Sequence, residues 1–111
     1  MNITYAVIIT PQAQCQIDEI RNYILYNLKV PNSASKFTNI LKTRIYSLGN
    51  FPKKIALVPD EPWHSRGIRK MVVQNLLVYF WVNDIEFTVF IISVVYARRN
   101  HTIHLMQILN L

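Results

Sequence analysis

Basic residues gather in the second half of the chain, next to segments that read as apolar strands. Seven Lys or Arg residues fall between positions 53 and 99, including the pairs Arg69-Lys70 and Arg98-Arg99. Guanidinium and ammonium groups set at the ends of rigid strands can clamp phosphate or a carboxylate patch on a partner. The alternative is that they only solvate the strand ends. We favour a functional patch.

The pair Arg69-Lys70 cannot act as one unit on a flat strand. Successive side chains of a strand point to opposite faces of the sheet. We therefore expect one of the two to join the patch and the other to extend over apolar surface.

Three histidines raise the possibility of a metal site or of proton transfer. His64 falls in a Pro-rich segment, while His101 and His104 are three residues apart near the C-terminus. No additional Cys or paired carboxylate completes a ligand set, so we predict no metal site and no cofactor. His101 remains a candidate general acid.

Composition indicates one small domain, which we take to span residues 1–111. The chain is 51% hydrophobic, has a formal net charge of +6 and contains a single cysteine, Cys15. The charge favours a polyanion or an acidic protein as partner, and the lone cysteine excludes a disulfide framework within the chain. The N-terminus lacks a signal-peptide pattern and no apolar run is long enough for a membrane span, so we expect a cytoplasmic protein with no membrane contact.

Periodicity in the first half predicts a strand and a helical hairpin. Residues 3–9 are rich in β-branched types and read as a strand. Thr10 and Pro11 then provide an N-cap and a first helical residue. One helix has the apolar stripe Ala13, Ile17, Ile20, Ile24 and Leu28, and a second, over 34–48, has Ala34, Phe37, Leu41, Ile45 and Leu48.

The second half reads as a long loop followed by three strands. Residues 51–66 contain three prolines and read as a loop, with a possible short strand at 55–58. Strands are expected at 68–73, 76–82 and 87–96, with a tight turn at Gln74-Asn75 in which Asn takes positive φ. The predicted fold class is α+β, with an antiparallel twisted sheet of about four strands and the helical hairpin on one face (β-α-α-β-β-β).

The last two strands are apolar on both faces, whereas two helices cover only one. The second face needs the loop, a second copy or a partner chain, unless the sheet curls like a small barrel. We incline to a partner.

The order of elements, together with several short motifs, resembles the RelE/ParE superfamily of toxins from type II toxin–antitoxin pairs. The resemblance covers nearly the whole chain, and no single motif in it is specific. Its carriers are Ala13…Ile17-Asp18-Glu19-Ile20…Tyr23-Ile24, Ala34…Phe37, Leu48…Phe51-Pro52, Trp63…Gly67-Ile68-Arg69-Lys70-Met71, Asn75…Val78-Tyr79-Phe80 and Val94…Tyr96…Arg98-Arg99.

This resemblance implies a toxin used in plasmid stabilisation and neutralised by a cognate antitoxin in a hetero-oligomer, with operator DNA reached only through the antitoxin. ParE-like members inhibit DNA gyrase, and RelE-like members cut mRNA on the ribosome. Lys70 falls at a family nuclease position. Other such positions hold Leu77, Ala97 and Ile103, with Arg98 and His101 as neighbouring candidates.

Because this nuclease set is incomplete, gyrase inhibition is slightly favoured over mRNA cleavage. The candidate catalytic residues, if the chain is a nuclease, are Lys70, Arg98 and His101. The candidate binding residues are Arg66, Arg69, Tyr96 and Arg99.

Overall fold

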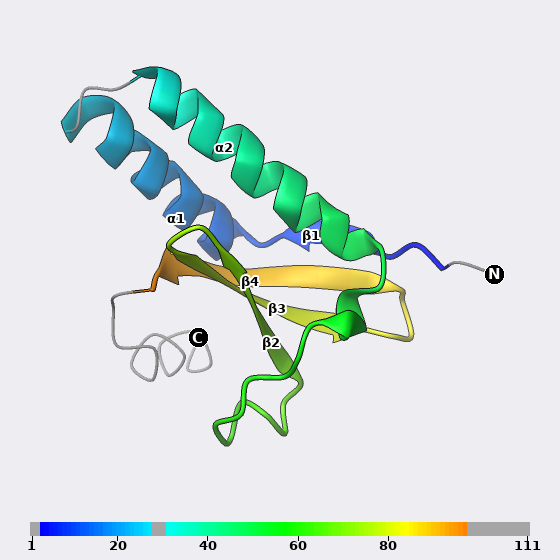
Figure 1. Cartoon of the computed structure of the whole chain (residues 1–111). Helices are drawn as coiled ribbons and strands as arrows, with labels where there is room; N and C mark the ends of the chain where they lie inside the picture. The colour runs from blue at the N-terminus through cyan, green and yellow to red at the C-terminus, as the bar shows by residue number, and fades with distance from the viewer. Residues whose placement is uncertain (1–2, 28–30, 98–111) are drawn as a thin grey trace.

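The computed structural model describes residues 3–27 and 31–97, and it has the predicted α+β fold class. Two helices, packed side by side as a hairpin, lie over one face of a four-stranded sheet (Figure 1). The elements are β1 (Ala6–Ile9), α1 (Pro11–Asn22) continued by a π-helical turn (Tyr23–Asn27), α2 (Pro31–Tyr46), β2 (Ile68–Val73), β3 (Leu76–Asn83) and β4 (Thr88–Tyr96), with 3₁₀ turns at Ser47–Gly49 and Pro52–Lys54.

The sheet is mixed rather than wholly antiparallel. Its strand order is β1-β4-β3-β2, and β1 pairs with β4 in parallel while the other two pairs are antiparallel. The helical hairpin lies between β1 and the rest of the sheet in the sequence. A crossover of that length is what a parallel pair requires.

The start of α1 is as predicted. Thr10 is the N-cap, its Oγ1 accepts a hydrogen bond from the Ala13 N–H at 3.3 Å, and Pro11 occupies the first turn. The same hydroxyl donates to the Ile91 carbonyl at 2.7 Å. One side chain therefore caps the helix and attaches it to β4.

The main core lies between the helices and the sheet, and both predicted helical stripes face it. Leu28 lies outside the described residues. The stripe positions buried or packed against this core are Ala13, Ile17, Ile20, Ile24, Ala34, Phe37, Leu41, Ile45 and Leu48.

A second apolar cluster lies on the opposite face of the sheet. Val58 and Trp63 of the 51–66 loop pack there with strand residues, among them Leu77 and Tyr79. The loop thus supplies cover that we had inclined to assign to a partner. The possible strand at 55–58 is a single β-bridge, Leu57 to Arg69.

Two local features depart from the predicted hairpins. In the β2–β3 turn it is Gln74, with φ of 54°, that has positive φ, rather than Asn75. Between β3 and β4 the register shifts by one residue at Tyr79/Phe80, and beyond this bulge the Gln16 side chain accepts hydrogen bonds from Ser93 Oγ and the Val94 N–H. Within the described ranges, no helix combines the length and the apolar character that a membrane crossing needs.

Candidate functional site

Lys70 lies on the sheet face opposite the helices, in a row that crosses three strands. The tight turn at 74–75 pairs Lys70 of β2 with Tyr79 of β3, and Tyr79 pairs with Ser93 of β4. Directly opposed side chains of an antiparallel pair are close enough to interact. Lys70 is half-buried, and Tyr79 is 1% exposed.

The Tyr79 phenol is buried and has no hydrogen-bond partner among residues 3–27 and 31–97. Burial, together with the negative charge of Asp60, raises the pKa of Tyr79 to about 12. The phenol is therefore neutral at pH 7 and offers a proton donor rather than a base.

Trp63 adds a second unpartnered donor to the same cluster, because its indole Nε1 is buried and also lacks an acceptor. Buried polar groups nearly always find partners in folded proteins.

Arg69 lies on the other face of β2, the face it shares with Met71. Its guanidinium donates to the Ile55 carbonyl at 2.5 Å and to the Lys53 carbonyl at 3.4 Å. Arg69 thereby holds the loop against the sheet edge, and Lys70 is the residue of the pair that faces the second cluster.

The other predicted site residues that the structure describes are Arg66 and Tyr96. Arg66 is exposed on the loop, and Tyr96 is half-buried against the helix-side core. Arg98, Arg99 and His101 lie outside the described residues. Within 3–27 and 31–97, no three His, Cys, Asp or Glu side chains come together to hold a metal ion. His64, the described histidine, has Nδ1 3.1 Å from the Val58 carbonyl oxygen.

An exposed apolar row crosses the same face beyond the loop. Ile8 of β1, Phe90 of β4 and Trp81 of β3 are neighbours in register. Trp81 stacks on Phe90 with ring centroids 5.8 Å apart and remains 38% exposed, and Ile8 is 47% exposed. Aromatic side chains left at a surface in this way are typical contact residues for a protein partner.

Comparison with known proteins identifies the class to which this fold and face belong. Residues 7–101 match the family model described as the ParE toxin of the type II toxin–antitoxin system, parDE. The chain therefore belongs to the ParE toxin family, within the RelE/ParE superfamily that its motifs resemble.

Solved structures show the same fold. A chain of the chromosomal ParDE toxin–antitoxin system from P. aeruginosa superposes with a TM-score of 0.70 at 18% identity, covering 86% of this chain and 98% of that one. A chain of the RelBE2 toxin–antitoxin complex from Mycobacterium tuberculosis superposes with a TM-score of 0.60 at 15% identity, covering 85% and 92%. No significant match was found among curated proteins.

Proposed function

We propose that this type II toxin acts in the ParE manner, by binding DNA gyrase through protein contacts, and that a cognate antitoxin neutralises it in a hetero-oligomer. The family match supports the toxin assignment. The observation that carries the mode of action is the composition of the sheet face opposite the helices. It combines the partly exposed apolar row Ile8, Phe90 and Trp81 with one cationic strand residue, Lys70.

That composition suits protein contact better than RNA cleavage. Cleavage through a 2′-hydroxyl needs a base, an acid and cations that stabilise the phosphorane. Of the described strand residues only Arg69 and Lys70 are cationic, and Arg69 lies on the other face. The neighbour of Lys70 across the strands is a neutral phenol with its pKa at about 12, which cannot serve as base at pH 7.

The apolar row, with Ile8 and Trp81 exposed and Phe90 half-buried between them, provides what a protein contact needs. Interfaces concentrate their binding energy in a few aromatic and aliphatic anchors. The two unpartnered donors, Trp63 Nε1 and the Tyr79 hydroxyl, belong to the cluster that covers the rest of this face.

The second candidate function is ribosome-dependent mRNA cleavage. It is favoured by Lys70, which occupies the position expected of a RelE-type lysine and lies opposite a buried tyrosine. In that case Arg98 and His101 would supply the second cation and the acid.

The substitution Lys70→Gln separates the two mechanisms when the chain is induced without antitoxin. If the toxin acts by protein contact, the Lys70→Gln variant should lose less than about tenfold in toxicity, because one half-buried charge at an interface contributes modestly to binding. If the toxin cleaves mRNA, the same variant should lose about a hundredfold or more in cleavage activity, because a cation that stabilises the transition state is removed. The readouts are growth rate and the 5′ ends of ribosome-bound mRNA, with Lys36→Gln on the exposed surface of α2 as the matched control. A hundredfold loss with Lys70→Gln alone would reject the contact mechanism.

A further inference from the structure

Three segments that are distant in sequence meet at Asp84, at the end of the molecule where β1 begins. The Asp84 carboxylate accepts a hydrogen bond from the Tyr5 hydroxyl at 2.8 Å and pairs with Lys53 Nζ at 3.0 Å. Lys53, and then Tyr5, lower the pKa of Asp84, so that it is ionised at neutral pH. These contacts tie the start of β1, the 3₁₀ turn at Pro52–Lys54 and the β3–β4 turn together.

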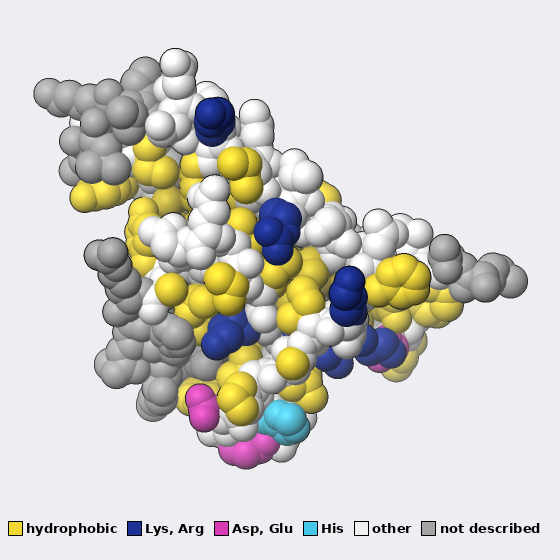
Figure 2. Space-filling model, viewed as in Figure 1, with side chains coloured by type: hydrophobic (Ala, Val, Ile, Leu, Met, Phe, Trp, Pro, Cys, Tyr) yellow, Lys and Arg dark blue, Asp and Glu magenta, His cyan; other side chains and the backbone are white. Residues whose placement is uncertain are grey.

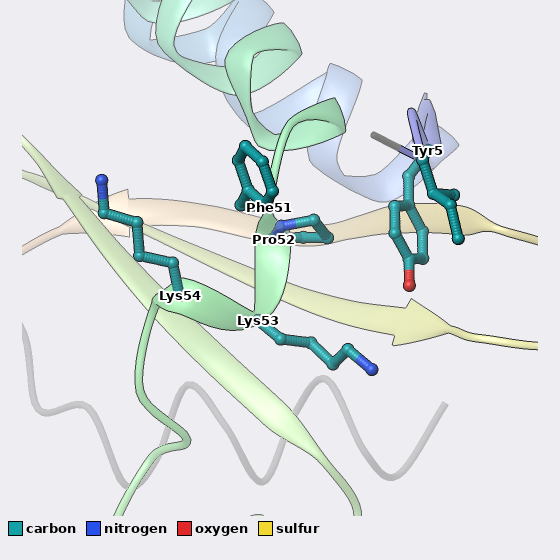
Figure 3. Close-up of a pocket in the computed structure, with 6 residues that line it drawn as sticks. Tyr5, Phe51, Pro52, Lys53 and Lys54 are labelled. Carbon is teal, nitrogen blue, oxygen red and sulfur yellow. The ribbon is translucent and has the colours of Figure 1, made fainter. Parts of the chain in front are cut away.

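The surface built on this junction is apolar and aromatic. We name it the Tyr5 platform. Tyr5 is half-buried and the other members are exposed, and the set is Ile3, Tyr5, Phe51, Lys53, Lys54 and Phe87. Tyr5 and Phe87 meet edge to face with ring centroids 5.6 Å apart. A cavity of about 430 Å³ opens beside them, lined by Ile3, Tyr5, Phe51, Pro52, Lys53 and Lys54 (Figure 3).

Phe51 is held in a conformation that its residue type does not favour. Its φ and ψ are 56° and 55°, in the left-handed region, and it precedes Pro52, which disfavours helical conformations in the residue before it. The side chain gains little packing in return, since it is 63% exposed. Strain kept at an exposed aromatic residue is typical of binding sites.

Phe87 repeats the pattern in the β3–β4 turn. The Asn83 Oδ1 accepts hydrogen bonds from the N–H groups of Ile85 and Glu86, which shapes the turn, and Phe87 then takes a φ of 49°. This is a position where glycine is the usual choice. Phe87 is 45% exposed, so two strained aromatic residues flank Tyr5.

The charge of the platform points to an acidic ligand. Lys53 and Lys54 extend to opposite sides of the turn (Figure 3), and among the described residues Asp84 pairs with Lys53 while no acid pairs with Lys54. Over the face seen in Figure 2, Lys and Arg side chains are spread from the helices to the loop, whereas most acidic side chains in view lie near the lower edge and one lies beside basic side chains at the right. The whole chain carries +6.

We propose that the Tyr5 platform binds an acidic segment of the cognate antitoxin, with an apolar side chain of that segment in the cavity and a carboxylate at Lys54. The antitoxin is the occupant because both structural relatives come from toxin–antitoxin systems. Lys54, with which no described acid pairs, favours an acidic segment of that antitoxin. This inference rests on the proposed function, since it requires that an antitoxin exists.

The test uses the full chain and, as probe, the purified product of a short reading frame adjacent to its gene; the absence of any such frame would count against the proposed function itself. Phe51→Gly removes the aromatic ring and suits positive φ, so the variant keeps its fold. Lys54→Glu reverses the unpaired charge. Tyr26→Ala is the control, because Tyr26 is 68% exposed on the π-helical turn at the end of α1, away from the platform.

We expect Phe51→Gly and Lys54→Glu each to weaken the affinity for the probe at least tenfold in calorimetric titrations, with Tyr26→Ala unchanged. Raising salt from 50 to 500 mM should shrink the effect of Lys54→Glu but not that of Phe51→Gly. In cells, Phe51→Gly should cause growth arrest at antitoxin levels that rescue the wild type.

Two results would overturn this inference while leaving the proposed function in place. The first is wild-type affinity for the probe in both platform variants. The second is loss of toxicity in Phe51→Gly with antitoxin binding intact, which would mean that the platform binds the toxin's target. If the wild-type chain neither arrests growth nor binds the probe, the proposed function itself fails.

Discussion

The substitution Tyr79→Phe tests whether the Tyr79 hydroxyl is buried without a hydrogen-bond partner. The phenol is 1% exposed and has no hydrogen-bond partner. An unpaired buried hydroxyl costs about 1–3 kcal/mol relative to water. Removing it leaves the ring in place, so we expect the variant to be about 1 kcal/mol more stable at pH 7, with Tm higher by about 4 °C.

The same variant should alter how stability depends on pH. The pKa of Tyr79 is about 12 in the folded chain against an ordinary value of 10.0. A group whose folded pKa is raised contributes stability fully below its unfolded pKa and loses it as pH rises through the folded pKa. A rise of this size corresponds to about 3 kcal/mol. The advantage of Tyr79→Phe should therefore widen by about that amount between pH 10 and pH 12.

Urea unfolding of both proteins from pH 7 to pH 12 measures this difference directly. Other tyrosines and lysines titrate in both chains and cancel in the comparison. A variant destabilised by more than about 1 kcal/mol at pH 7, with a gap that does not change with pH, would mean that the hydroxyl has a partner, and the reasoning would be refuted.

Two further substitutions test how the sheet is joined to the helices. Gly49→Ala places a Cβ 2.7 Å from the Tyr5 carbonyl oxygen, so the start of β1 must shift. We expect the free energy of unfolding in urea to fall by about 2 kcal/mol. A fall of less than about 0.5 kcal/mol would contradict that close approach. Thr10→Ala removes both the N-cap bond and the bond to the Ile91 carbonyl, which should cost about 2 kcal/mol and leave Thr10→Ser near wild type. Equal losses in both Thr10 variants would show that the hydroxyl is not responsible.

Local signals in the sequence predicted most of the fold. The Thr10-Pro11 start and the apolar stripes depend on residues close in the chain, and the structure confirms both. The parallel pairing of β1 with β4 depends instead on bringing together the first and last strands, which are separated by both helices, β2 and β3, and no local pattern specifies this.

The candidate site was predicted less completely. A two-residue turn at 74–75 pairs residues equally far on either side of it, so the opposition of Lys70 and Tyr79 could have been derived from the predicted hairpin. The Tyr5 platform could not, because phenylalanine at positive φ runs against residue preference and the Asp84 junction joins three distant segments.

The central claim is that the toxin acts by contact with gyrase and not by cutting RNA. The most direct measurement incubates the purified chain with gyrase, ATP and relaxed plasmid, and in parallel with ribosomes translating a defined mRNA. The account predicts that supercoiling is blocked while the mRNA stays intact, and that adding the antitoxin restores supercoiling. Cleavage of the mRNA on the ribosome with gyrase activity unaffected would contradict it.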